Sequence, residues 1–152
     1  MARITGEIVI ERPPEEVFDF VAAERNEPSY NHQMLAVEQL TEGPVGSGTR
    51  FQAQMGRGRP GEERRTLPML VEFTTFERPR RLGSVASFAG VTTDGELTFV
   101  PRGDTTLLRW SWDVTLPGAL RLLAPLVLWT GRREERRVWQ GLKRLLEEGR
   151  PV

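Results

Sequence analysis

Few side chains in this 152-residue chain could perform acid–base or nucleophilic chemistry. The chain has no cysteine, one histidine (His32), one tyrosine (Tyr30) and one lysine, Lys143 near the C-terminus. The lack of cysteine excludes a thiolate nucleophile, a disulfide framework and thiolate zinc sites, and a single histidine excludes paired-histidine zinc motifs. The remaining candidates for a general acid or base are His32, Tyr30 and the adjacent carboxylates Glu134 and Glu135.

Glu134 and Glu135 lie in a C-terminal segment with helical periodicity, at the border of its apolar stripe. From that border a carboxylate could meet a ligand hydroxyl or an inward arginine, whereas a buried carboxylate without a partner would be costly. The pair is surrounded by Arg132, Arg133, Arg136 and Arg137. Because these arginines offer exposed ion pairs, the sequence favours a solvated position for both glutamates.

Tyr30 and His32 share a polar connection that spans residues 24–32. The reference pKa of histidine lies near neutrality, which suits a general acid or base. No local motif places an acidic residue beside His32, so a surface position is its simpler interpretation. For Tyr30 we predict that the ring packs against the helices, with donation of its hydroxyl to a ligand as the alternative.

The elements that would position these residues follow from the hydrophobic pattern. Alternation predicts a strand over 3–10, and two prolines followed by two glutamates predict a short helix over 15–21. Alternating segments separated by glycine and proline then predict six more strands, over 34–41, 49–56, 65–76, 81–88, 94–100 and 105–116. A run of hairpins of this kind is typical of an antiparallel sheet.

After residue 118 the periodicity becomes helical. One continuous stripe contains Leu120, Ala124, Val127, Gly131, Val138, Leu142 and Leu145. Pro125 should kink or split this helix near its first turns. Strands in one run, with helices segregated in sequence, predict an α+β domain.

Five segments, in this order and spacing, resemble the START and birch-pollen-allergen-like helix-grip superfamily (SRPBCC), and in particular its polyketide cyclase/dehydrase-like members. The matching segments are residues 8–21, 26–30, 44–51, 76–82 and 106–110. The family often has tryptophan where Tyr30 stands. The resemblance implies one helix-grip domain over 1–152, with a seven-stranded sheet curved around the C-terminal helix and an apolar cavity between them. It implies no single reaction, because the family includes carriers, cyclases, aromatases and receptors.

Strand parity nominates the side chains that face such a cavity, because alternate residues of a strand share a face. The predicted ligand contacts are Tyr30, Phe51, Met55, Met69, Phe73, Phe88, Phe99, Trp110, Trp112 and Gly131. Aromatic side chains and methionine often line pockets for apolar ligands, although the same residues could simply pack as core. A glycine in the helix stripe costs about 1 kcal/mol of helix stability relative to alanine, which favours a cavity there. Close helix–sheet contact or a kink is the alternative role for Gly131.

Leu122, Leu126 and Trp129 fall on the opposite face of the C-terminal helix. Either the Pro125 kink folds them against the body of the protein, or they form an interface with a second copy. We predict at least a weak homodimer.

Charge and hydropathy argue against nucleic acid and a membrane as partners. The 21 basic and 21 acidic residues balance, so no overall field favours nucleic acid. The first residues lack the apolar segment of a signal peptide, and the most apolar stretch, 119–129, is shorter than the roughly 20 residues that span a bilayer. We therefore expect a cytoplasmic protein with no membrane span, no cofactor and no bound metal.

The sequence leaves two main hypotheses for the function and a third, less favoured one. The shortage of catalytic groups favours binding of a small hydrophobic molecule, such as a lipid, a polyketide or an aromatic metabolite. The alternative is a polyketide cyclase or aromatase-like enzyme, because orientation in a pocket supplies much of a cyclisation barrier and needs few catalytic residues. The third is a protein-interaction or stress-response module whose core is filled.

Overall fold

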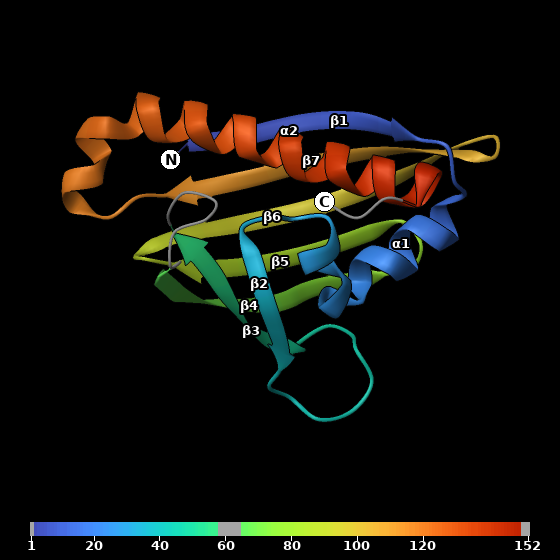
Figure 1. The fold of residues 1–152 in the computed structure, drawn as a ribbon, viewed down its shortest axis with the longest axis horizontal. Helices are drawn as coiled ribbons and strands as arrows, with labels where there is room; N and C mark the ends of the chain where they lie inside the picture. Colours follow the sequence, from blue (N-terminus) through green and yellow to red (C-terminus); the bar gives the residue numbers. More distant parts are fainter. Residues whose placement is uncertain (1, 58–64, 150–152) are drawn as a thin grey trace.

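The computed structural model describes residues 2–57 and 65–149, and the chain forms seven strands, two α-helices and two short 3-10 helices in the described part (Figure 1). The strands are β1 (Ala2–Ile10), β2 (Met34–Gln39), β3 (Arg50–Arg57), β4 (Arg65–Glu77), β5 (Arg81–Phe88), β6 (Val91–Arg102) and β7 (Thr105–Thr115). The helical elements are α1 (Pro14–Ala22), η1 (Glu24–Ser29), η2 (Gly118–Leu123) and α2 (Ala124–Glu148). Each predicted element is therefore present, with its ends shifted by at most a few residues.

The seven strands form one antiparallel sheet in the order β1-β7-β6-β5-β4-β3-β2. The predicted six-strand meander is confirmed, and the first strand joins its far edge by pairing with β7 from Ala2 opposite Val114 to Ile10 opposite Thr106. β6 begins three residues before the predicted segment 94–100, because Val91 pairs with β5 and the next two residues pair with both β5 and β7. This extension brings Val91 and Thr93 into the sheet.

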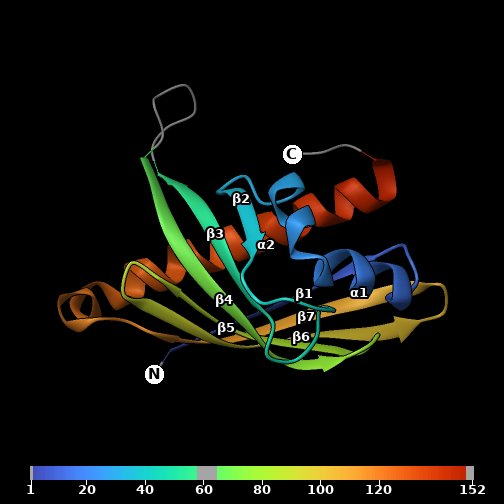
Figure 2. The same ribbon diagram turned by 90° about the horizontal axis from the view of Figure 1, so that it is seen from below.

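The C-terminal helix lies across the concave side of the sheet. Figure 2 shows β3 and β4 turning away from the line of β6 and β7, with α2 crossing the space between them. Pro125 stands at the start of α2, where its missing N–H costs nothing, and the preceding residues form η2. The predicted split near Pro125 is confirmed, so Leu120 belongs to the 3-10 segment and not to the α-helix.

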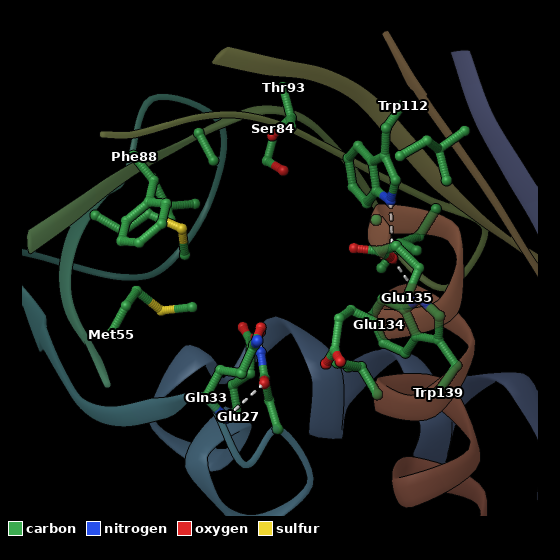
Figure 3. Close-up of a pocket in the computed structure, with 18 of the residues that line it drawn as sticks. Glu27, Gln33, Met55, Ser84, Phe88, Thr93, Trp112, Glu134, Glu135 and Trp139 are labelled. Carbon is green, nitrogen blue, oxygen red and sulfur yellow. Dashed lines mark hydrogen bonds between the residues drawn. The ribbon is translucent and has the colours of Figure 1, made fainter. Parts of the chain in front are cut away.

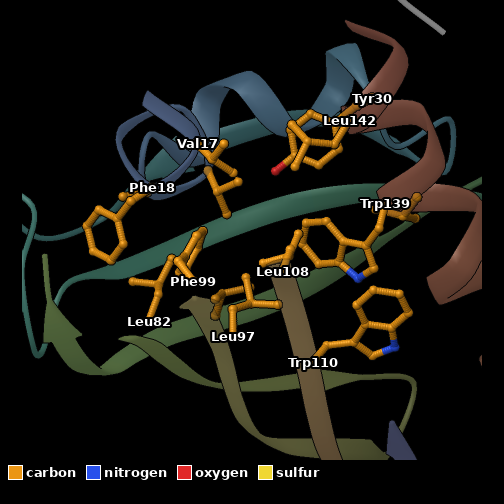
Figure 4. Packing of buried hydrophobic residues seen from close by; sticks show 14 of the residues in the cluster. Val17, Phe18, Tyr30, Leu82, Leu97, Phe99, Leu108, Trp110, Trp139 and Leu142 are labelled. Atoms are coloured by element: carbon orange, nitrogen blue, oxygen red, sulfur yellow. The ribbon is translucent and has the colours of Figure 1, made fainter. Parts of the chain in front are cut away.

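One end of the space between sheet and helices is filled by aromatic and aliphatic side chains (Figure 4). Val17 and Phe18 of α1 are fully buried, and Phe18 packs edge-on against Phe99 at 5.2 Å between ring centroids. Leu108 of β7 and Leu142 of α2 are buried completely beside them. The α1 helix thus closes this end, and the hollow part of the interior must lie toward the other.

No helix in the described ranges, 2–57 and 65–149, is long and apolar enough to cross a membrane. The cytoplasmic location expected from the sequence stays a prediction.

Candidate functional site

A cavity of about 340 Å³ lies between the sheet and the first half of α2. Its apolar wall comes from β3 to β7 and from α2, and includes Met55, Met69, Val71, Ala86, Phe88, Val91, Trp112, Val114, Val127 and Leu128. Its polar wall comes mainly from η1, the residues that follow it, and α2, and includes Glu24, Glu27, Asn31, Gln33, Glu134 and Glu135. Figure 3 shows Met55 and Phe88 at one side and Glu134, Glu135 and Trp112 at the other. The cavity is thus apolar at one end and acidic at the other.

Seven of the ten predicted ligand contacts lie on the cavity wall. They are Tyr30, Met55, Met69, Phe73, Phe88, Trp112 and Gly131. The structure therefore brings these side chains together around one space, and their role as ligand contacts stays a prediction.

The other three predicted residues, Phe51, Phe99 and Trp110, do not line the cavity and are packed in the core. Phe51 lies against Phe73 with 5.0 Å between ring centroids, and Phe99 contacts Phe18 at the filled end. The indole of Trp110 covers Gly6 of β1, where a Cβ atom would come within 2.2 Å of the ring. Alternation along the strands predicted correctly that these side chains face the helices. They lie outside the part of the interior that contains the cavity.

Gly131 combines the two roles that the sequence left open. It lines the cavity, and an added Cβ atom would meet Cδ1 of Ile4 at 2.8 Å. Glycine here lets α2 approach β1 closely. The atom it would meet is the flexible end of the Ile4 side chain and not the backbone of β1.

Glu135 is held by two hydrogen bonds and is largely buried, so the prediction of a solvated position for it is wrong. Its Oε2 accepts hydrogen bonds from the indole N–H of Trp139 at 2.8 Å and of Trp112 at 3.1 Å (Figure 3). Burial raises the pKa of Glu135 to about 7, although both indole hydrogen bonds favour the charged form and oppose that rise. The group can therefore gain or lose a proton near neutral pH.

Glu134 also lines the cavity, and its side chain is 26% exposed, so it lies between the cavity and the solvent. Its Oε2 is enclosed and accepts no hydrogen bond within the described part of the chain. The Nε2 atom of His32 lies 3.8 Å from this oxygen, a distance at which a protonated imidazole would form an ion pair. His32 does not line the cavity but stands beside a residue that does. Its acidic partner comes from another element, which no local motif could reveal.

A second pair of carboxylates comes from η1, and the sequence analysis missed it. Glu24 is 9% exposed, and burial together with the neighbouring charge of Glu27 raises its pKa well above the usual range. Burial also raises the pKa of Glu27, against the hydrogen bonds it receives from Glu24 and from Asn31 Nδ2, the latter at 2.9 Å. A neutral Glu24 that donates to Glu27 explains how two acids share this small space.

Tyr30 is placed as predicted, with its ring packed against helices. It is 2% exposed, and its ring lies 6.1 Å from those of Phe20 and Trp139. Burial raises the pKa of Tyr30 well above its usual value, so the hydroxyl keeps its proton. Because Tyr30 also lines the cavity, its ring is both core and wall.

Some of the missed residues carried a signal. Trp139 follows Glu135 by four residues, the spacing at which two side chains of a helix meet. Glu24, Glu27 and Asn31 recur at three- and four-residue intervals, the spacing of side chains on one face of a helical segment. Nothing in the sequence pointed to Thr93, because β6 begins at Val91 and the alternation of apolar residues predicted a start at residue 94.

The arrangement can therefore hold an apolar molecule and present carboxyl groups to one part of it. Glu135 could act as a general acid or base on a bound molecule. Across residues 2–57 and 65–149, no three His, Asp or Glu side chains gather in the manner of a metal site.

Comparisons with known proteins place this geometry in context. The model of the polyketide cyclase/dehydrase and lipid transport family matches residues 1–147. No curated protein matches the sequence.

Solved structures match the fold over almost the whole chain. A protein from Thermus thermophilus, TTHA0849, has a TM-score of 0.75 and 18% identity, covering 93% of this chain and 94% of its own. A START superfamily protein from Mycobacterium smegmatis has a TM-score of 0.73 and 14% identity, with coverage of 93% and 94%. The di-domain ARO/CYC StfQ from the steffimycin biosynthetic pathway has a TM-score of 0.69 and 20% identity over 96% of this chain and 45% of its own. At these identities the likeness concerns the fold.

Proposed function

Because the chain belongs to the polyketide cyclase/dehydrase and lipid transport family, we propose that it binds a small, mainly apolar molecule between its sheet and α2. The family and the helix-grip fold support a module for hydrophobic ligands or for polyketide cyclisation. The ligand would lie against Met55, Met69 and Phe88 and would present its polar groups to the carboxylates at the other end.

The observation that carries this proposal is the division of the interior. Aromatic side chains fill the end beneath α1, whereas a space of about 340 Å³ lies beneath the first half of α2. Ligand pockets of roughly 300–1,000 Å³ are typical for small molecules. A protein whose core served packing alone would gain by filling this space, since buried voids reduce stability.

A neutral, polarity-sensitive dye tests the proposal directly. We expect Nile red to bind saturably with one site per chain, with the blue-shifted emission of an apolar environment. A panel of lipids, polyketides and aromatic compounds that displaces the dye would then define the ligand. The absence of saturable dye binding would overturn the proposal and favour the filled-core interaction module.

A cyclase or aromatase-like enzyme is the second candidate, and Glu135 is the observation that favours it. A carboxyl group with a pKa of about 7 on the wall of an apolar cavity is suited to proton transfer near neutral pH. StfQ, described as an aromatase/cyclase, has a domain of the same fold. His32 and Glu134 would act together in this scheme, and Tyr30 would donate its hydroxyl.

The two candidates differ in what substitution does to a ligand once one is known. If the protein is an enzyme, Glu135→Gln should abolish turnover and leave binding of the substrate intact. Glu134→Gln and His32→Ala should lower turnover by a smaller factor. Product formation by chromatography, beside Nile red displacement, separates loss of chemistry from loss of binding. A carrier would release every compound unchanged.

We also propose a weak homodimer through the N-terminal part of α2 and the preceding η2. Leu122 is 87% exposed, and Leu126 and Trp129 are 60% and 58% exposed, so the kink at Pro125 does not bury them. Arg133 lies 5.6 Å above the Trp129 ring but leaves most of it open. Adjacent exposed apolar side chains of this size are typical of an interface.

Sedimentation velocity over a concentration series checks the dimer. We expect the weight-average mass to rise at high micromolar concentration, and the double variant Leu122→Ser, Leu126→Ser to stay monomeric. Leu70→Ser, which removes a leucine of β4 that is 53% exposed, is the control and should dimerise like the parent chain. A parent chain that remains monomeric throughout would refute the interface.

A further inference from the structure

The charged side chains on the cavity wall all have the same sign. Glu24, Glu27, Glu134 and Glu135 line it, and no arginine or lysine of the described ranges does. This is unexpected in a chain whose acidic and basic residues are equal in number.

Two carboxyl oxygens of this wall have no donor within the described part of the chain. The Oε2 atoms of Glu24 and Glu134 are both enclosed and accept no hydrogen bond from any described residue. Glu24 is more than nine-tenths buried and lines the cavity. Enclosed acceptors of this kind are costly unless a donor reaches them, so they point to a ligand that carries donors.

The orientation of the cavity carboxyl groups also indicates a ligand that carries hydrogen-bond donors. Figure 3 shows Glu27, Glu134 and Glu135 turned toward the cavity, from η1 on one side and α2 on the other. One oxygen of Glu135 is held by both indole N–H groups, and the other faces the open space. Met55 and Phe88 lie at the opposite side, where they would contact an apolar body.

Because Glu27, Glu134 and Glu135 face a cavity whose opposite side is formed by apolar side chains such as Met55 and Phe88, we infer that the ligand is a cationic amphiphile, an apolar body that carries a protonated amine. An ammonium group supplies up to three N–H donors and a positive charge in one position. A fatty acid or another carboxylate would instead add a negative charge to this group of acids. The inference rests on the proposed binding function and names its ligand class.

Three probes of equal chain length that differ only in the head group test this inference: decylamine, decan-1-ol and decanoic acid. Near neutral pH we expect decylamine to displace Nile red at a concentration at least about tenfold lower than decan-1-ol, with decanoic acid weakest. Equal affinities, or a preference for decanoic acid, would overturn the inference and leave the proposed function standing. Failure of all three probes together with Nile red would overturn both.

Substitution of single carboxylates tests which of them cause the preference for decylamine over decan-1-ol. Glu134→Gln and Glu135→Gln should each reduce the ratio of decylamine to decan-1-ol affinity several-fold, because each removes a negative charge while keeping the shape of the side chain. Glu38→Gln is the matched control, since Glu38 is exposed on β2, and it should leave the ratio unchanged. If neither cavity variant lowers the ratio, the amine does not bind where we infer.

The pH dependence gives an independent measurement. The groups that face Glu135 are Glu27 and Tyr30 from the η1 segment and the uncharged indoles of Trp112 and Trp139, and Glu134 faces His32. Decylamine affinity should rise about tenfold between about pH 6 and pH 8, as the ionised fraction of a group with a pKa of about 7 does. The rise should be absent for decan-1-ol and clearly smaller in Glu135→Gln, in which Glu27 is the cavity carboxyl group that still has a raised pKa. A flat profile for decylamine would contradict the inference.

Discussion

Ala86→Phe should abolish most ligand binding while the protein stays folded. Ala86 lies in the middle of β5, between Val71 of β4 and Thr93 of β6 in the sheet register, and all three side chains line the cavity. A phenyl ring at this position would occupy the space in which the ligand should lie. We expect the affinity for Nile red to fall by on the order of tenfold or more, because the lost contacts are those that supply the binding free energy.

The folded state should tolerate this change better than most additions to a core. Overpacking a filled interior costs typically about 1–3 kcal/mol, but here the new ring enters a cavity. The midpoint of thermal unfolding should therefore stay the same or rise. Ser87→Phe adds the same ring to the exposed face of the same strand and should leave dye binding unchanged. Undiminished binding by a folded Ala86→Phe protein would place the dye site elsewhere.

Glu135→Gln should stabilise the protein at alkaline pH and have little effect at acid pH. The pKa of Glu135 is about 7 in the folded protein and near 4.5 when the chain is unfolded. Between these values the folded state holds a proton that the unfolded state has released, so the wild-type free energy of unfolding falls as the pH rises. The difference corresponds to at most about 3 kcal/mol, since part of Glu135 remains open to the cavity.

Urea denaturation across this pH range measures the effect. The gain of Glu135→Gln over the wild type should grow from about pH 5 to about pH 8 and then level off. Glu24 and Glu27 also have raised pKa values and contribute to the slope of both proteins, so the difference between the two proteins reports Glu135 together with its interaction with Glu27. Glu38→Gln should show no such growth. A gain independent of pH would mean that Glu135 is ionised like a surface carboxylate.

The sequence predicted the architecture well because its signals are local. The alternation of Leu108, Trp110 and Trp112 gave the inward face of β7, and the helical stripe through Val138 and Leu142 gave the inward face of α2. Which part of that face is hollow could not be predicted in this way. It depends on how far α1 covers the sheet, and Phe18 fills the space beside Phe99 but leaves Trp112 at the cavity.

The acidic end of the site was harder to predict for a similar reason. The arginines around Glu134 and Glu135 suggested a solvated face, yet the carboxylate of Glu135 is held by Trp112, 23 residues earlier in the chain. Tertiary hydrogen bonds of this kind leave no trace in the spacing of residues. By contrast, Tyr30 was correctly placed because a lone aromatic ring in a polar connection has few places to be buried except against the helices.

Methionine methyl NMR tests most directly whether the space between the sheet and α2 binds an apolar molecule. Met55 and Met69 line the cavity, whereas Met34 packs in the same cluster as both but does not line the cavity. With ¹³C-methyl methionine and decan-1-ol as a neutral probe, we expect saturable shifts of the Met55 and Met69 methyl resonances and smaller ones of Met34. Unchanged Met55 and Met69 resonances up to the solubility limit of the probe would contradict the account.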